Sequence, residues 1–166
     1  EAQINAIDDM REAAVRINEL RHERIEKIER DVKAFEADVA AFNAYSAAAK
    51  LPKDTADEKA ARSAAIQKAL MAAVDPPMNT VRACVEVLEL CRPIAEKGNV
   101  QAVSDAGVGA LMAEAGMRAA ALNVQINLSW IKDAEFVERK RKELDALLAG
   151  RSEQKEQTVH YVESKL

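Results

Sequence analysis

Apolar side chains recur at helical spacing along most of the chain, and no segment alternates apolar and polar residues as a strand does. The pattern predicts one or two long helices over residues 3–49 and single helices over 55–73, 77–97, 100–128 and 133–150, with a further polar helix over 151–166. The first contains a three-heptad stripe, for which we expect a partner helix: Ile25, Ile28, Val32, Phe35, Val39 and Phe42. The expected fold class is therefore all-α, a bundle of long helices.

The local sequence marks several helix boundaries. Thr55 and Glu58 have the spacing of a capping box, in which each side chain bonds to the other residue's backbone N–H. Asp133 is placed to cap the helix that follows it. Gly98 and Gly150 stand where helices commonly end.

The helix expected over residues 100–128 is apolar or small nearly all round, and its charges are limited to Asp105, Glu114 and Arg118. Glu114 precedes Arg118 by four positions, which is the favourable order for an ion pair on a helix, so we expect these two to pair. A helix of this composition is expected to be buried at the centre of the bundle or at an interface. Glycine in a helix interior costs about 1 kcal/mol relative to alanine. We therefore expect another backbone or a ligand to approach closely at Gly107, Gly109 and Gly116.

The composition narrows the functional classes. A length of 166 residues suits one domain over residues 1–166, and a net charge of −4 without a basic patch argues against nucleic-acid binding. No apolar run is long enough to cross a membrane. Cys84 and Cys91 lie too far apart on one helix to form a disulfide, so we expect reduced thiols and a cytoplasmic protein. His22 and His160 belong to no metal-binding cluster, so no metal site is expected.

Five polar residues stand out against this apolar helix: Asn99, Ser104, Asp105, Asn123 and Asn127. They either cap the helix and bond to neighbouring loops or form a ligand site at one or both helix ends. Asp105 and Asn127 lie about 33 Å apart along a straight helix, so one chain cannot bring them together. They could meet if two copies paired antiparallel with the glycine face as the seam, which predicts a two-fold dimer.

Three segments resemble motifs of the formiminotetrahydrofolate cyclodeaminase and methenyltetrahydrofolate cyclohydrolase family. Residues 98–105 read G-N-V-Q-A-V-S-D and match the family's G-N-x-x-x-x-S-D signature. Residues 119–137 are similar to its A-x-x-N-V-x-I-N-x-x-x-x-x-D-x-x-F pattern. Residues 38–58 resemble its D-x-x-A-F…L-P-K-x-T-x-x-E element, so the likeness extends over about residues 38–148.

The resemblance implies an all-α enzyme of packed antiparallel helices, usually a homodimer. It also implies that the enzyme acts on a folate and needs no metal or redox cofactor beyond this substrate. Cyclodeaminases convert 5-formiminotetrahydrofolate to 5,10-methenyltetrahydrofolate and release ammonia, whereas cyclohydrolases interconvert the methenyl and 10-formyl forms. The first activity is our leading expectation, and the motifs do not separate the two.

The resemblance also suggests roles for individual residues. Asp105 and Ser104 are the candidate catalytic residues, and burial would suit Asp105 for proton transfer at the one-carbon bridge. The candidates for binding the substrate are Asn99, Asn123 and Asn127, together with Lys50 and Lys53, which could attract the acidic glutamyl tail.

Two departures from the family pattern favour a further alternative. The family's P-T-P-G-G-G-S segment has no counterpart here, and we expect it to belong ahead of Glu1. Ala49 stands where the family often has a tyrosine. An inactive helical relative that binds folate or serves as a scaffold therefore remains an alternative.

Overall fold

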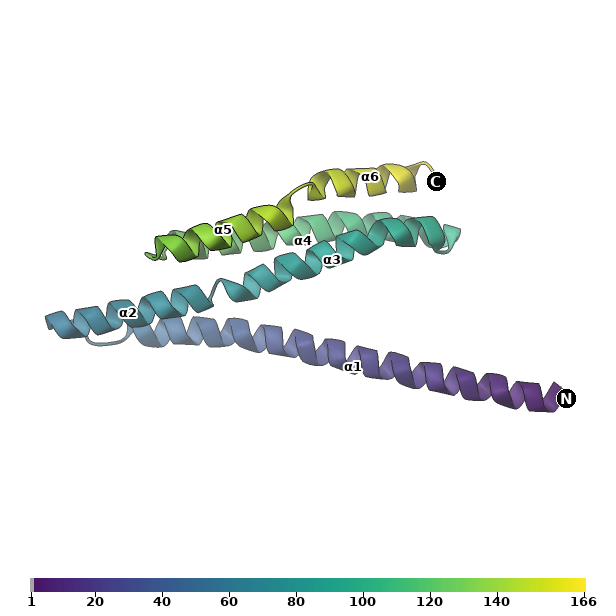
Figure 1. Ribbon diagram of the computed structural model, residues 1–166, viewed down its shortest axis with the longest axis horizontal. Helices are drawn as coiled ribbons and strands as arrows, with labels where there is room; N and C mark the ends of the chain where they lie inside the picture. The colour runs from purple at the N-terminus through teal and green to yellow at the C-terminus, as the bar shows by residue number, and fades with distance from the viewer. Residues whose placement is uncertain (1) are drawn as a thin grey trace. The chain divides into compact units, whose positions relative to one another are not determined.

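The structure, a computed structural model, describes residues 2–166, with side chains from residue 11 onward except 12, 13, 20, 23, 30, 31 and 34. Within that range every regular element is a helix, which confirms the predicted all-α class (Figure 1). The elements are α1 (Ala2–Ala49), α2 (Ala56–Ala72), α3 (Asp75–Lys97), the short 3-10 helix η1 (Val100–Ala102), α4 (Val103–Ser129), α5 (Ala134–Leu148) and α6 (Arg151–Glu163).

The chain divides into two compact units, Glu1–Val39 and Ala40–Leu166. The first unit is a single helical segment, so it contains no second helix for the apolar stripe of α1. Five members of that stripe are between 41% and 71% exposed: Ile25, Ile28, Val32, Phe35 and Val39. A partner helix for this stripe and a single domain over residues 1–166 both stay predictions.

The second unit is built on the antiparallel pair α3 and α4. α5 lies along one end of this pair and α6 along the other (Figure 1). The five largest fully buried side chains of this unit come from α3, α4 and α5 and are Met78, Leu88, Met117, Leu128 and Leu144. α4 is thus the central helix that its composition predicted.

The glycines of α4 allow this close packing. A Cβ atom built on Gly109 would lie 3.4 Å from the Cys91 Sγ, and one on Gly116 would lie 3.2 Å from the Cys84 Sγ. A Cβ on Gly107 would lie 3.2 Å from the Val162 Cγ1 of α6. Side chains of α3 and α6 therefore make the close approach, whereas we expected another backbone or a ligand there. Because the chain itself occupies the glycine face, the prediction that this face forms the seam between two copies is wrong.

Both cysteines are free thiols, as expected. Burial raises the pKa of the Cys84 thiol and that of the Cys91 thiol above the ordinary value for cysteine, because apolar surroundings disfavour the thiolate. The Cys91 Sγ also lies 3.1 Å from the Val87 carbonyl oxygen, to which it donates a hydrogen bond.

Side chains fix the helix boundaries as the sequence predicted. The Glu58 N–H donates to the Thr55 Oγ1 at 3.2 Å, and the Thr55 N–H donates to the Glu58 Oε2 at 2.9 Å, which completes the capping box. The bonds that the Thr55 and Asp54 N–H groups donate to the Glu58 carboxylate lower the pKa of Glu58. The Phe136 N–H donates to the Asp133 Oδ1 at 2.9 Å at the start of α5. Gly150 has a φ of 72°, so it supplies the left-handed residue between α5 and α6.

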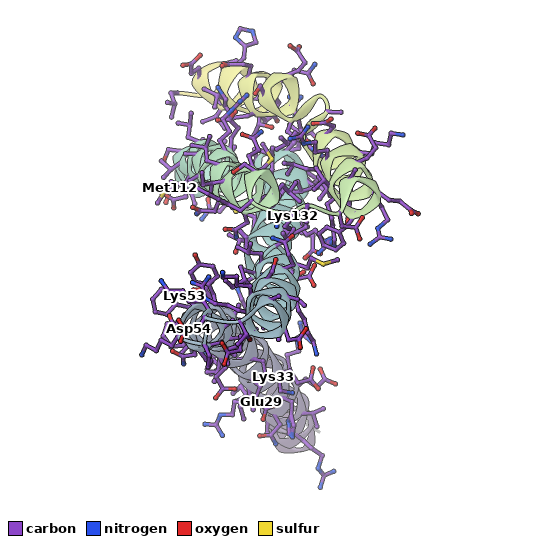
Figure 2. All side chains as sticks on the ribbon, turned by 90° about the vertical axis from the view of Figure 1, so that its left-hand side faces the viewer. Glu29, Lys33, Lys53, Asp54, Met112 and Lys132 are labelled. Carbon is purple, nitrogen blue, oxygen red and sulfur yellow. The ribbon has the colours of Figure 1, made fainter. Side chains whose placement is uncertain are left out.

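One face of α4 is not covered by the second unit. Its side chains alternate between the buried face and an exposed apolar stripe that includes Val108, Met112, Leu122 and Ile126. Figure 2 shows Met112 on the side of the bundle that is turned away from α5. Both faces of α4 are therefore apolar, although the second unit buries only one of them.

Candidate functional site

Ser104 and Asp105 lie in the first turn of α4 and are both exposed. A carboxylate in this position interacts favourably with the positive end of the helix dipole. Burial of Asp105, which the sequence analysis expected, is absent in the single chain, because no element of the second unit covers this side of the first turn. Asn99 precedes both residues and caps η1, since its Oδ1 accepts a bond of 3.0 Å from the Gln101 N–H.

Asn123 and Asn127 lie one turn apart near the end of α4 but have different surroundings. The Asn127 Nδ2 donates a hydrogen bond of 2.7 Å to the Ala73 carbonyl oxygen at the end of α2. This bond anchors α4 to the α2–α3 junction, so Asn127 has a structural role in this chain. Asn123 is exposed and lies on the outward side of the helix.

The two ends of α4 do not form one site within a chain. Asp105 and Asn123 are separated by five helical turns, which is about 27 Å along the axis. The structure therefore brings Asn99, Ser104 and Asp105 together at one end, and leaves Asn123 and Asn127 at the other.

Exposed lysines surround the α1–α2 connection. Lys50 and Lys53 lie in this loop and are exposed (Lys53 is labelled in Figure 2). The Arg62 guanidinium of α2 steadies the loop by donating two bonds of 3.1 Å to the Ala49 carbonyl oxygen. These positions leave both ammonium groups accessible to an anionic ligand.

Lys132 is a further lysine to which the sequence analysis gave no role, although it lies within one of the matching motifs. Its backbone N–H donates to the Gln67 Oε1 at 2.7 Å, and its Nζ lies 3.5 Å from the Ser63 Oγ. Both contacts join the α4–α5 connection to α2. The sequence feature that could have drawn attention to Lys132 is its position next to the capping residue Asp133.

A polar network fixes the middle of α4 against α6. Glu114 accepts hydrogen bonds from Arg118 and from the Ser152 hydroxyl, and the Arg118 guanidinium also bonds to Ser152. The predicted pairing of Glu114 with Arg118 is thereby confirmed. The bonds from Arg118 and Ser152 lower the pKa of Glu114 below its ordinary value, although partial burial acts in the opposite direction.

The described residues contain no group of three His, Cys, Asp or Glu side chains placed to hold a metal ion. None of their helices combines the length and the apolar composition that a membrane span requires.

Known proteins resemble this chain in sequence and in fold. A methenyltetrahydrofolate cyclohydrolase of Methylorubrum extorquens is 48% identical over 129 residues, which are 78% of this chain and 62% of that protein. A formimidoyltransferase-cyclodeaminase of Sus scrofa is 37% identical over 68% of this chain, which corresponds to 21% of its own length. The crystal structure of a formiminotetrahydrofolate cyclodeaminase from Thermotoga maritima superposes with a TM-score of 0.57 at 27% identity, covering 81% of this chain and 61% of that one.

The chain thus spans less than two thirds of the length of each of these relatives. The sequence profile of the formiminotransferase-cyclodeaminase family matches residues 2–146, which is most of the chain. The motifs around Asp105 and Asn123 fall within this match. The chain therefore belongs to the formiminotransferase-cyclodeaminase family.

Proposed function

We propose that this chain hydrolyses 5,10-methenyltetrahydrofolate to 10-formyltetrahydrofolate. The observation that carries the proposal is the 48% identity with a methenyltetrahydrofolate cyclohydrolase over 78% of the chain. From the motifs alone we expected the cyclodeaminase activity first. The higher identity to the cyclohydrolase, compared with 37% for the cyclodeaminase of Sus scrofa, favours the reverse order.

The reaction requires proton transfer at one carbon atom. Water adds to the cationic methenyl carbon between N5 and N10, forms a C–O bond and loses one proton, which gives a neutral tetrahedral intermediate. The C–N5 bond then breaks, the hydroxyl proton leaves as the C=O bond forms, and N5 takes up a proton. One proton is released overall, and the substrate changes from a cation to a neutral amide.

Asp105 is our candidate for the group that meets this cationic bridge. Its carboxylate attracts the methenyl cation and can accept the proton that the attacking water loses. Ser104 is adjacent to Asp105 and can bond to the developing hydroxyl. Asn99 lies at the same end of α4 and can supply an amide donor and acceptor for the edge of the pterin ring. Asn123 lies at the other end of α4 and could bind the same substrate only from a second copy of the chain. No metal or redox cofactor is needed in this scheme, because water and proton transfers complete it.

Cyclodeamination is the second candidate, and the fold similarity to the Thermotoga maritima cyclodeaminase favours it. In this reaction N10 attacks the formimino carbon and loses its proton, the formimino nitrogen takes up two protons in all, and the C–N bond to it breaks with release of ammonia. The product is the same methenyl bridge. Asp105 would again face a carbon that gains positive charge.

The test uses the 166-residue chain and measures two substrates. Loss of methenyltetrahydrofolate absorbance above the uncatalysed rate supports the cyclohydrolase, and ammonia release from formiminotetrahydrofolate supports the cyclodeaminase. Asp105→Asn should abolish either activity while leaving the helical circular dichroism unchanged. Asp57→Asn is the matched control, because Asp57 is another exposed carboxylate in the first turn of a helix. Absence of both activities in the wild-type chain would refute the proposed function.

Lys50 and Lys53 complete the proposal as attractive charges for the glutamyl tail. Replacing both with alanine should raise KM more for a polyglutamylated folate than for the monoglutamate, with little change in kcat. We also propose a cytoplasmic location, where the free thiols of Cys84 and Cys91 would remain reduced.

A further inference from the structure

The last helix, α6, lies beyond residue 146, where the match to the family profile ends. It packs against α3 and α4 within the second unit (Figure 1). Ser152 near its start bonds to Glu114 in the middle of α4, and Val162 near its end lies against Gly107 in the second turn of α4. α6 therefore runs antiparallel to α4, towards the end of α4 that carries the candidate catalytic residues.

The start of α4 has no side-chain cap. Its N-cap residue is Ala102, which makes no side-chain bond to the first turn, whereas Thr55 and Asp133 cap α2 and α5. Without a cap, the first N–H groups of a helix gain no side-chain acceptor, and the helix end is less stable. The buried clusters of the second unit contain α4 residues from Ala110 onward, which lie beyond the first turn. The turn that bears Asp105 therefore depends on other packing contacts for its position.

Val162 supplies one such contact from α6. A Cβ atom on Gly107 would lie 3.2 Å from the Val162 Cγ1 and 3.5 Å from its Cβ and Cγ2, so the valine fills the space beside the glycine. Both residues are buried. Gly107 follows Asp105 by two positions, which is about 200° round the helix. Val162 therefore supports the start of α4 from the side opposite Asp105 and leaves the carboxylate accessible.

Arg92 of α3 holds this part of α6 in place. Its Nη1 donates to the Gln157 carbonyl oxygen at 3.0 Å, and its Cζ lies 4.2 Å from the centre of the Tyr161 ring. A guanidinium over the face of an aromatic ring contributes a cation–π attraction. The Arg92 Nε also donates a bond of 2.6 Å to Glu96, which orients the guanidinium. The two contacts with α6 fix the turn of that helix that leads to Val162.

Resting on the proposed function, we propose that Arg92 and Val162 are positioning residues for the reaction. Arg92 holds the end of α6, Val162 holds the start of α4, and the start of α4 sets the position of Asp105. Misplacing a reacting group by about 1 Å can cost a factor of about 100 in rate. Loss of this support should therefore lower kcat. KM should change less, because Lys50 and Lys53 attract the glutamyl tail elsewhere in the chain.

A pair of compensating substitutions tests the contact between α6 and α4. Val162→Ala removes the Cγ1 and Cγ2 beside Gly107 and should lower kcat for methenyltetrahydrofolate hydrolysis about tenfold, with KM nearly unchanged. Gly107→Ala should have the same effect, because its Cβ pushes Val162 away. In the double variant the two Cβ atoms lie 3.5 Å apart, which is an ordinary contact, so kcat should return to near the wild-type value.

Gly116→Ala is the matched control for crowding on α4. Its Cβ would lie 3.2 Å from the Cys84 Sγ, which is the distance found at Gly107. However, Gly116 is about 17 Å from Asp105 along the helix axis. Gly116→Ala should therefore leave kcat unchanged, and circular dichroism should show that all these variants keep their helices.

The contact between α3 and α6 is tested in the same assay. Arg92→Ala and Tyr161→Ala should each lower kcat, because either change removes the cation–π contact. Tyr161→Phe keeps the ring beside the guanidinium and should keep the wild-type kcat. A loss of kcat in Tyr161→Phe as large as that in Tyr161→Ala would overturn the role of Arg92.

Hydrogen exchange follows the start of α4 directly. The N–H groups of residues 107–110 donate to the carbonyl groups of residues 103–106, so their exchange should be faster in Val162→Ala and slow again in the double variant. An active wild-type chain would overturn this inference, and leave the proposed function intact, in either of two cases. Val162→Ala could have the wild-type kcat, or Gly116→Ala could lose as much kcat as Gly107→Ala. A wild-type chain without either folate activity would overturn both.

Discussion

Because α3 packs closely against α4, the effect of Gly116→Ala on the free energy of unfolding should depend on the neighbouring Cys84 side chain. The substitution should gain about 1 kcal/mol of helix propensity. However, the new Cβ would lie 3.2 Å from the Cys84 Sγ, so the sulfur must move by a few tenths of an ångström. Moving a side chain away from its preferred rotamer costs about 0.5–1.5 kcal/mol. The two effects nearly cancel, so we expect Gly116→Ala to leave the free energy of unfolding within about 0.5 kcal/mol of wild type.

Removing the sulfur should restore the full gain. In a Cys84→Ala background the new methyl group meets no close atom, so Gly116→Ala should stabilise the chain by about 1 kcal/mol. The difference between the two backgrounds is the coupling energy of a double-mutant cycle. Gly109→Ala is an internal control, because its Cβ would lie 3.4 Å from the Cys91 Sγ, an ordinary contact, and should stabilise the wild-type chain directly.

The assay is urea unfolding followed by circular dichroism, in which a shift of the midpoint at an unchanged m-value reports the free energy of unfolding. Equal effects of Gly116→Ala in the wild-type and Cys84→Ala backgrounds would refute the reasoning, because the sulfur would then impose no steric restriction.

Three further predictions concern single contacts. Asn127→Ala should lower the free energy of unfolding by about 1 kcal/mol, measured by urea unfolding, because the Ala73 carbonyl oxygen loses its donor. Thr55→Ala should cost about 1 kcal/mol through loss of the capping box, and a Thr55→Ser variant should recover most of it. Glu114→Gln should destabilise the chain near neutral pH, but less as the pH falls below the ordinary pKa of glutamate. The lowered pKa of Glu114 means that its stabilising contribution is present above that value and is lost as the pH falls through its folded-state pKa, which unfolding midpoints over this range would show.

The sequence was sufficient to predict a contact wherever that contact lies within one short segment. The capping box at Thr55 needs only the residues up to Glu58, and the Asp133 cap needs only the next three, so both could be predicted. The pairing of Glu114 with Arg118 likewise depends on one turn of helix. Each is a contact between near neighbours and needs no knowledge of the fold.

The packing of α4 could be predicted only in part, because helix partners are not encoded in one segment. Glycines in a helix interior indicated a close approach, but their partners lie on α3 and α6. The sequence did contain a signal for the packing of the glycines against α3. Cys84 and Cys91 are seven positions apart, as are Gly109 and Gly116, and antiparallel packing brings each thiol to one glycine. Composition alone also could not show which side of α4 the chain itself covers, and so it placed Asp105 in a buried setting.

The two faces of α4 have different tasks, and this separation relates its stability to its proposed chemistry. The inner face is fixed by the contacts of Gly109 and Gly116 with α3 and by the bond from Asn127 to α2. A helix held along its whole length keeps residues at its two ends at a constant separation. The outer face presents Asp105 and Asn123 at those ends. This constant separation fixes where Asp105, a candidate catalytic residue, and Asn123, a candidate for binding the substrate, lie relative to each other. The close packing inside the second unit would therefore determine the positions of these two side chains on the outer face.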